Sequence, residues 1–203
     1  MTDTAALSVE APPQTDWDIS SAEDLKSIKY NAGRDHRFHL MNDIEITDEY
    51  WNPIGSSKQP FSGAFYGNNH TITFTKDTEL IQSYGAENSG CGLFGYIYAG
   101  QICDLNIVFQ GNLTSAENNT GAVVGMLDGN YSYSASTPPL LHNCKVSAKR
   151  YSITGLENTG GLVGCVVNGS IENCSSDASV ISQKKNAGGS AGYVFNGTFI
   201  NSS

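Results

Sequence analysis

A short motif bracketed by glycines recurs along the second half of this 203-residue chain and constrains its fold more than any other feature. The first copy reads Gly-Leu-Phe-Gly-Tyr-Ile at residues 92–97, and three related copies follow it. The second glycine of each copy stands at Gly95, Gly125, Gly164 and Gly192. These positions fit a period of about 29 residues, if about ten residues are inserted after the second copy. A repeat of this length is typical of a solenoid, in which stacked coils bury a face that one coil cannot bury alone.

The composition and the local patterns favour strands within each repeat. Charged residues make up 15% of the chain and hydrophobic residues 39%, and many short apolar runs are broken by glycine and asparagine. Phe38, Leu40, Ile44 and Ile46 alternate with polar residues, which predicts strands. Residues 61–72 predict a strand, a tight turn and a second strand. The chain is therefore expected to be all-β.

Alignment of the repeats produces columns of equivalent residues. An inward apolar column is predicted at Ile102, Leu141, Ile171 and Phe199. A second column follows three residues later, at Leu105, Cys144, Cys174 and Ser202. A polar column lies between them, at Asp104, Asn143, Asn173 and Asn201. Stacked asparagine amides can hydrogen-bond from coil to coil at the strand spacing of about 4.8 Å. The pairs Asp128-Gly129, Asn168-Gly169 and Asn196-Gly197 are expected to supply the positive φ of tight turns.

One short helix is predicted ahead of the repeats. Ser20 or Ser21 can cap its start, and Glu23 or Asp24 can complete a capping box. The helix should end at residues 31–33, which read Asn-Ala-Gly. We expect it to cover the N-terminal end of the stack.

The repeats resemble the GLUG repeat family. The resemblance rests on residues 92–97, on Gly-Gly-Leu-Val-Gly-Cys-Val at 160–166 and on Asn-Gly-Ser-Ile-Glu-Asn-Cys at 168–174. It extends over about residues 17–203 and is specific for fold and location rather than for function. Such repeats occur in secreted or surface proteins, mainly of bacteria and archaea, including large adhesins and the non-catalytic part of IgA-protease-type metallopeptidases.

The repeats and the resemblance together predict a right-handed parallel β-helix, a solenoid with a short N-terminal capping helix. Residues 1–16 show no periodicity and are expected to form a flexible tail or leader. Residues 17–89 should contain the cap helix and the first coils, and residues 90–203 the GLUG-type repeats.

The charge and the cysteines narrow the range of partners. A net charge of −9 disfavours nucleic acid and anionic membranes, and no apolar run is long enough for membrane insertion. No export signal is recognisable after Met1, so we expect any such signal to have been removed. The five cysteines are odd in number and form no C-x-x-C, which argues against a disulfide framework and zinc. Cys144 and Cys174 occupy equivalent positions in neighbouring coils, so their side chains should lie close together. They would form either stacked thiols or a disulfide.

The sequence gives little support for a catalytic or metal-binding site. Residues 188–192 match G-x-S-x-G around Ser190, but the nucleophile elbow needs a strand, a turn and a helix, so a repeat position is the better interpretation. The four histidines are scattered, and no metal site is expected from them. The acidic residues between Asp43 and Glu49 lack the spacing of a calcium loop. No cofactor is predicted, and the chain is not expected to be an enzyme.

Candidate binding and modification residues lie in loops. Tyr131 and Tyr133 belong to the insertion at residues 130–139, and exposed aromatic rings there can stack on sugar rings or contact a protein. Among the N-x-S/T sequons, Asn112, Asn118 and Asn130 fall in predicted loops and are the candidate glycosylation sites.

The sequence thus predicts a non-catalytic extracellular or cell-surface module that acts in adhesion or binding. Its partner would be a glycan or a surface protein of a host or neighbouring cell. One alternative is a structural solenoid that self-associates through an uncapped C-terminal coil into filaments or a surface layer. Another alternative is a polysaccharide-active enzyme, by analogy with other parallel β-helices. A fourth is the non-catalytic portion of a larger secreted peptidase.

Overall fold

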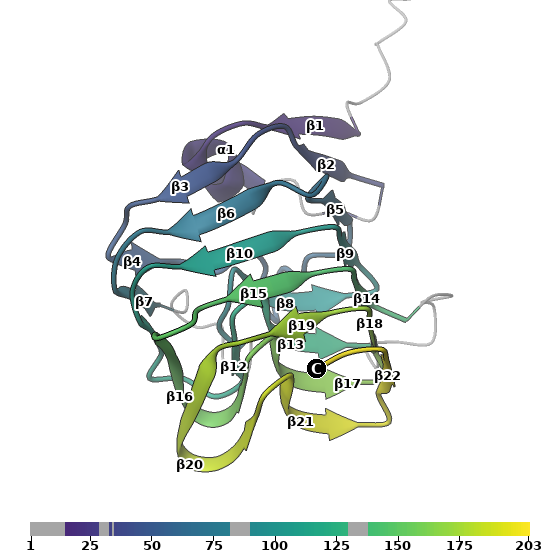
Figure 1. Ribbon diagram of the computed structural model, residues 1–203. Helices are drawn as coiled ribbons and strands as arrows, with labels where there is room; N and C mark the ends of the chain where they lie inside the picture. Colours follow the sequence, from purple (N-terminus) through teal and green to yellow (C-terminus); the bar gives the residue numbers. More distant parts are fainter. Residues whose placement is uncertain (1–14, 29–32, 34, 82–89, 130–137) are drawn as a thin grey trace, which may run out of the picture.

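The computed structural model describes residues 15–28, 33, 35–81, 90–129 and 138–203 (Figure 1). This part of the chain is nearly all β, with one short helix, and its strands form four parallel sheets. Within it, no helix is long and apolar enough to cross a membrane. The all-β prediction is confirmed.

The four sheets are called A to D. Sheet A contains β1 (Asp16–Ile19), β2 (Arg37–Leu40), β5 (Ala64–Tyr66), β9 (Gln101–Cys103), β14 (Leu140–His142), β18 (Ser170–Glu172) and β22 (Thr198–Ile200). Sheet B contains β3 (Ile44–Ile46), β6 (Thr71–Phe74), β10 (Asn106–Phe109), β15 (Lys145–Ser147) and β19 (Ser175–Ser176). Sheet C contains β4 (Tyr50–Trp51), β7 (Thr78–Leu80), β11 (Leu113–Thr114), β12 (Thr120–Gly121), β16 (Ser152–Gly160) and β20 (Ser179–Gly188). Sheet D contains β8 (Phe94–Tyr98), β13 (Val124–Asp128), β17 (Val163–Val167) and β21 (Ala191–Phe195).

From β5 onward the chain visits the sheets in the order A, B, C, D and then returns to sheet A one strand further along (Figure 1). Each such circuit is called a coil, and the strands of one coil pair in parallel with those of the next. The repeats seen in the sequence are therefore successive coils. Strand β1, which begins at Asp16, already pairs with β2, so the stack starts at the edge of the expected tail.

The predicted apolar column forms the core behind sheet A. Leu141 pairs with Ile102 on one side and with Ile171 on the other, and Ile171 pairs with Phe199. The first three side chains are fully buried. The second predicted column is also present, since Leu105, Cys144 and Cys174 are buried in the same core.

Asparagines in the left-handed conformation turn the chain at the corners of each coil. In the predicted polar column, Asp104, Asn143, Asn173 and Asn201 all have φ between 49° and 56°. Asn143 Nδ2 donates to Asp104 Oδ1 at 2.6 Å, and Asn201 Nδ2 donates to Asn173 Oδ1 at 3.1 Å. Asparagine tolerates this conformation, and in these two pairs its amide bonds the equivalent residue of the preceding coil. The Asn173 amide instead lies 3.4 Å from His142 Nε2.

Two further corners repeat this arrangement, and the sequence did not single out the first of them. Asn158 donates to Asn119 at 2.8 Å and accepts from Asn186 at 2.7 Å, and all three have positive φ. At the other corner, Asn196 donates to Asn168 at 2.6 Å.

The prediction for the Asx-Gly pairs was only partly right. In two of them the asparagine takes the positive φ, and Gly169 and Gly197 do not. In the third pair, Asp128 belongs to β13 and Gly129 has no positive φ. The left-handed residue is the asparagine because its side chain gains the bond between coils.

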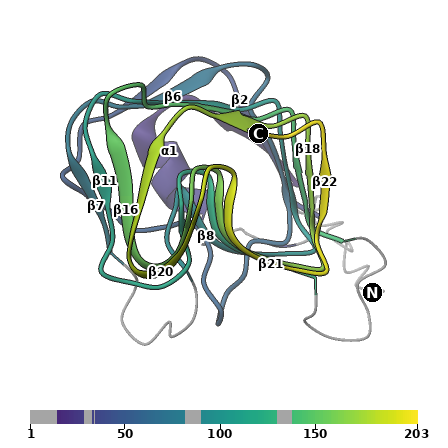
Figure 2. The ribbon, with the colours of Figure 1, turned by 60° about the horizontal axis from the view of Figure 1, so that its bottom comes forward.

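The glycine motif produces an inward fold of the chain between sheets C and D. Figure 2, viewed along the stack, shows each coil turning back into the interior between β16 and β17 and between β20 and β21. A Cβ on Gly164 would collide with the backbone of Asn119, and one on Gly192 with that of Asn158. The second glycine of each motif is therefore required because the preceding coil's corner lies against it.

Helix α1 (Ala22–Ser27) lies across the first coils, at the opposite end of the stack from β22 (Figures 1 and 2). Ser21 caps it by accepting a hydrogen bond from Asp24 N at 3.1 Å, and Asp24 accepts one from Ser20 N at 3.0 Å. Leu25 is fully buried in the common core. A helix is present where it was predicted, but it ends at Ser27 with Ile28 as its C-cap, before the predicted end at residues 31–33. Residues 31 and 32 lie outside the described part.

We predict that Gly164→Ala destabilises the fold by about 1–3 kcal/mol, because the new methyl group collides with backbone that cannot move without shifting a coil. Gly189→Ala is the matched control, since its Cβ would meet nothing within 4 Å. Urea unfolding followed by circular dichroism measures both variants. Equal midpoints for the two would contradict the steric role of the second glycine.

Candidate functional site

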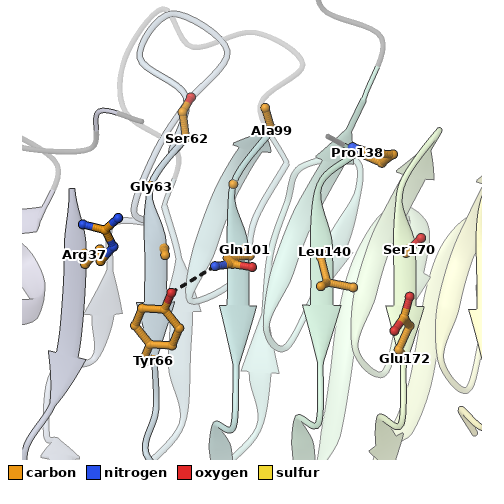
Figure 3. A pocket seen from close by; sticks show the side chains of 12 residues that line it. Arg37, Ser62, Gly63, Tyr66, Ala99, Gln101, Pro138, Leu140, Ser170 and Glu172 are labelled. Carbon is orange, nitrogen blue, oxygen red and sulfur yellow. Dashed lines mark hydrogen bonds between the residues drawn. The ribbon is translucent and has the colours of Figure 1, made fainter. Parts of the chain in front are cut away.

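A groove of about 550 Å³ lies on the outer face of sheet A and crosses five adjacent strands (Figure 3). Its floor is formed by strand residues and its rim by residues that precede the strands. The lining residues are Arg37, Ser62, Gly63, Ala64, Tyr66, Ala99, Gly100, Gln101, Pro138, Leu140, Ser170 and Glu172. We call it the sheet-A groove. It gathers side chains from several coils.

Alternation along the strands decides which side chains reach the groove. The central residue of each three-residue strand points inward, as the burial of Phe65, Ile102 and Leu141 shows. The flanking residues point outward and form two columns. The first runs through Arg37, Ala64, Gln101, Leu140 and Ser170, and the second through His39, Tyr66, Cys103, His142 and Glu172.

Tyr66 is held on both sides in the middle of the groove. Its ring stacks on His39 of the neighbouring strand, with centroids 5.2 Å apart and an interplanar angle of 17°. Its hydroxyl accepts a hydrogen bond from Gln101 Nε2 at 3.1 Å, and Figure 3 shows the ring face-on. Because two neighbours fix it, the ring is ordered before any ligand arrives.

The charges of the groove lie at its two ends. Arg37 comes from β2 and Glu172 from β18, with Gln101 and Leu140 on the strands between them (Figure 3). Glu172 is the one carboxylate among the described residues that line the groove. These residues therefore lack the pair of carboxylates with which most glycosidases cleave their substrates.

The five cysteines are free thiols. Burial raises the pKa of four of them and makes these four poor nucleophiles, whereas the hydrogen bond with Cys144 lowers the pKa of Cys174. Burial raises the pKa of Cys103 to about 11, and the charge of Asp104 adds to this shift. Burial also raises the pKa values of Cys91 and Cys165 to about 11, and it raises the pKa of Cys144. Cys144 N donates to Cys174 Sγ at 3.3 Å, and both residues are free thiols, so the two equivalent cysteines lie next to each other without a disulfide.

The predicted binding residues belong to an insertion of which the structure describes only the end. Tyr131, Tyr133 and Asn130 lie outside the described residues, and Pro138, near the end of the predicted insertion, lines the groove.

The other two candidate glycosylation sites differ from each other. Asn118 is exposed beside the left-handed Asn119. The Asn112 side chain accepts from Ser152 N at 3.0 Å and donates to Asp77 at 3.2 Å, so it is engaged on both sides.

The candidate catalytic and metal-binding residues occupy positions that serve the fold. Ser190 lies between β20 and β21, and its carbonyl accepts from Leu162 N at 2.9 Å, so it occupies a repeat position between two strands. Among the described residues, no group of histidine, cysteine and acidic side chains could hold a metal ion. The acidic side chains after β2 interact with separate partners. Asp43 accepts a hydrogen bond from Thr71 N, and Asp48 forms an ion pair with Lys26.

The sequence analysis missed Tyr66, Gln101 and the other groove residues. Each is an ordinary outward residue of a short strand, and nothing in its local sequence distinguishes it. The register between coils brings them together. Alignment of the outward positions of all coils, in addition to the inward ones, would have found them.

Comparisons with known proteins agree with this architecture. Residues 155–181 match the GLUG motif, and this stretch runs from β16 through β17, β18 and β19 into β20. The chain carries a GLUG motif. The match covers just under one coil and includes Gly164, whose role is described above.

Two longer proteins resemble most of the chain. Halomucin of Haloquadratum walsbyi is 29% identical over 188 residues, which are 86% of this chain and 2% of halomucin. The crystal structure of a Bacteroides ovatus protein, provisionally assigned as an immunoglobulin A1 protease, superposes with a TM-score of 0.59 at 21% identity. That superposition covers 90% of this chain and 63% of the other chain, and it shows a shared fold. The chain therefore spans only part of each of the two proteins.

Proposed function

We propose that this chain is a right-handed parallel β-helix that serves as a non-catalytic binding or adhesive module of an extracellular or cell-surface protein. The sheet-A groove, with its ordered Tyr66, is the observation that carries the proposal. The groove takes residues from five coils, so a ligand would be recognised by the assembled stack and by no single repeat.

Several features support the location and the handedness. The GLUG motif resembles repeats of surface proteins, and the similarity to halomucin extends over most of this chain. The aligned region is 2% of halomucin, which favours a modular role within a much longer protein. Connections between parallel strands of one sheet are right-handed in about 98% of cases, which favours the right-handed winding.

The non-catalytic part of the proposal rests on the chemistry of the groove. Its described lining holds one carboxylate, and the half-buried thiol of Cys103, which lies next to Tyr66 in the outward column, has a pKa of about 11. Neither group supplies an acid–base pair or a thiolate at neutral pH. Turnover of a polysaccharide panel by the purified protein would contradict this part and favour the alternative of a polysaccharide-active enzyme.

We predict that Ala64→Trp abolishes binding to cell surfaces and to immobilised cell-surface extracts. Ala64 lies on the groove floor between Arg37 and Gln101, so an indole at this position fills the groove whatever the ligand is. Binding of fluorescently labelled protein measures the effect, and thermal unfolding confirms that the variant is folded.

Thr114→Trp is the matched control, because Thr114 is exposed on β11 in sheet C, away from the groove. Ser170→Trp blocks the groove near its other end and replaces the first variant if that one does not fold. Equal binding by the folded groove variants and the control would contradict a role of the groove.

A second candidate function is self-association through the last coil. Val194 and Phe199, in the last described coil, pair with the fully buried Val166 and Ile171 and are themselves 41% and 38% exposed. Phe195 and Ile200 of the same coil are also exposed. An apolar strand edge of this kind pairs readily with another chain, such as a second copy.

We predict that the 21.7 kDa chain forms larger species as its concentration rises, and that Phe199→Asp suppresses them. Multi-angle light scattering behind a sizing column measures the mass over a concentration series. Tyr50→Asp is the control, since Tyr50 is 59% exposed on β4, away from the last coil. A monomer at every concentration would contradict this second candidate.

A further inference from the structure

We propose that the ligand of the sheet-A groove is a neutral, linear polysaccharide that lies along the stack and packs a sugar ring on Tyr66. This inference rests on the proposed binding function and specifies its ligand. It is argued from the shape of the groove, from the fixed aromatic ring and from the balance of charge.

The shape of the groove fits a linear polymer. The groove crosses β2, β5, β9, β14 and β18 at right angles to the strands, so it follows the long axis of the stack (Figure 3). With neighbouring strands about 4.8 Å apart, its floor is about 19 Å long. A volume of about 550 Å³ lies within the range of ligand-binding clefts. A short stretch of an extended sugar chain fills such a space, whereas a compact ligand would leave much of it empty.

The Tyr66 ring supplies the kind of surface that a pyranose recognises. The axial C–H groups on one face of a sugar ring carry partial positive charge and pack against the negative face of an aromatic ring. Tyr66 is held by the His39 ring and by the Gln101 amide, so little side-chain entropy is lost on binding.

The flanking polar groups match sugar hydroxyls. Gln101, Ser170 and Glu172 offer an amide, a hydroxyl and a carboxylate along the groove. These groups donate to and accept from hydroxyl groups, each of which has one donor and two lone pairs.

The charges favour a neutral polymer over an acidic one. Within the described lining, the negative charge of Glu172 balances the positive charge of Arg37, so the groove has no excess of positive charge. The whole chain carries a net charge of −9, which repels uronate or sulfate groups.

A protein ligand fits the groove less well. Strands β5, β9 and β14 are each paired on both sides, so no free edge is present there for an added peptide strand. The apolar lining consists of small patches such as Ala64, Pro138 and Leu140, which offer no deep pocket for an aromatic or aliphatic anchor.

The test is calorimetric titration of the full chain with soluble neutral oligosaccharides of increasing length, in parallel with uronate-containing and sulfated ones. We expect binding to at least one neutral series, with affinity that rises with length until the groove is spanned. Tyr66→Ala should weaken this binding about tenfold or more, and Tyr66→Phe, which keeps the ring, should retain most of it. Tyr50→Ala is the matched control, because Tyr50 is an exposed tyrosine on sheet C.

Raising the salt concentration from 0.1 M to 1 M shortens the Debye length from about 10 Å to about 3 Å and should leave the affinity for a neutral chain nearly unchanged. Preference for acidic chains, with strong salt dependence, would overturn the proposal. It would also be overturned if no oligosaccharide bound, or if Tyr66→Ala bound as well as the parent. If Ala64→Trp still abolished binding to cell surfaces in those cases, the binding function would stand. The ligand would then be an acidic glycan if acidic chains bound, and a protein if no oligosaccharide bound.

Discussion

The stacking of the coils depends on one repeated turn. In this turn an asparagine with positive φ hydrogen-bonds to the equivalent asparagine of a neighbouring coil. Asn158 shows this most completely, because it donates to Asn119 and accepts from Asn186 while its own backbone has a φ of 52°. A side chain in this conformation usually costs about 1–2 kcal/mol, and asparagine reduces that cost. Since each corner fixes both the direction of the chain and its distance from the next coil, the parallel pairing of all four sheets follows from it.

The glycines and the groove are consequences of this stacking. Gly164 lies directly against the corner at Asn119, so the inward fold between sheets C and D is set by the preceding coil. On the outer face of sheet A, the same spacing places outward residues of successive strands in columns. Tyr66 stacks on His39 and bonds Gln101 because these residues occupy adjacent strands in a fixed register. A binding surface thus arises from residues that are far apart in the sequence.

Much of the fold could be predicted from the sequence, because repetition makes equivalent residues visible. The apolar column through Leu141, the polar column through Asn143 and the cap at Ser21 were all predicted and are present. The corner at Asn158 was not predicted, because Asn119, Asn158 and Asn186 lie outside the motif copies that were aligned. The positive φ of Asn168 was assigned correctly to the Asn-Gly pair, but its companion Gly169 does not share it.

The candidate site could not be predicted in the same way. Tyr66 stands in a short strand with no local signal, and its importance depends on which residues lie beside it in neighbouring coils. The aromatic residues that the sequence did single out, Tyr131 and Tyr133, lie outside the described residues. The sequence reveals which residues point inward because burial restricts their chemistry, whereas outward residues vary freely unless a ligand constrains them.

The most direct test of this account is the stability of two variants at the central corner, measured by equilibrium urea unfolding. Asn158→Ala removes both bonds between coils and leaves a methyl-bearing residue at positive φ, so we predict a loss of about 2–4 kcal/mol. Asn158→Gly removes the same bonds without the backbone strain and should lose about 1–2 kcal/mol. If both variants unfold within about 0.5 kcal/mol of the parent, the asparagine corners do not hold the coils together and the account is contradicted.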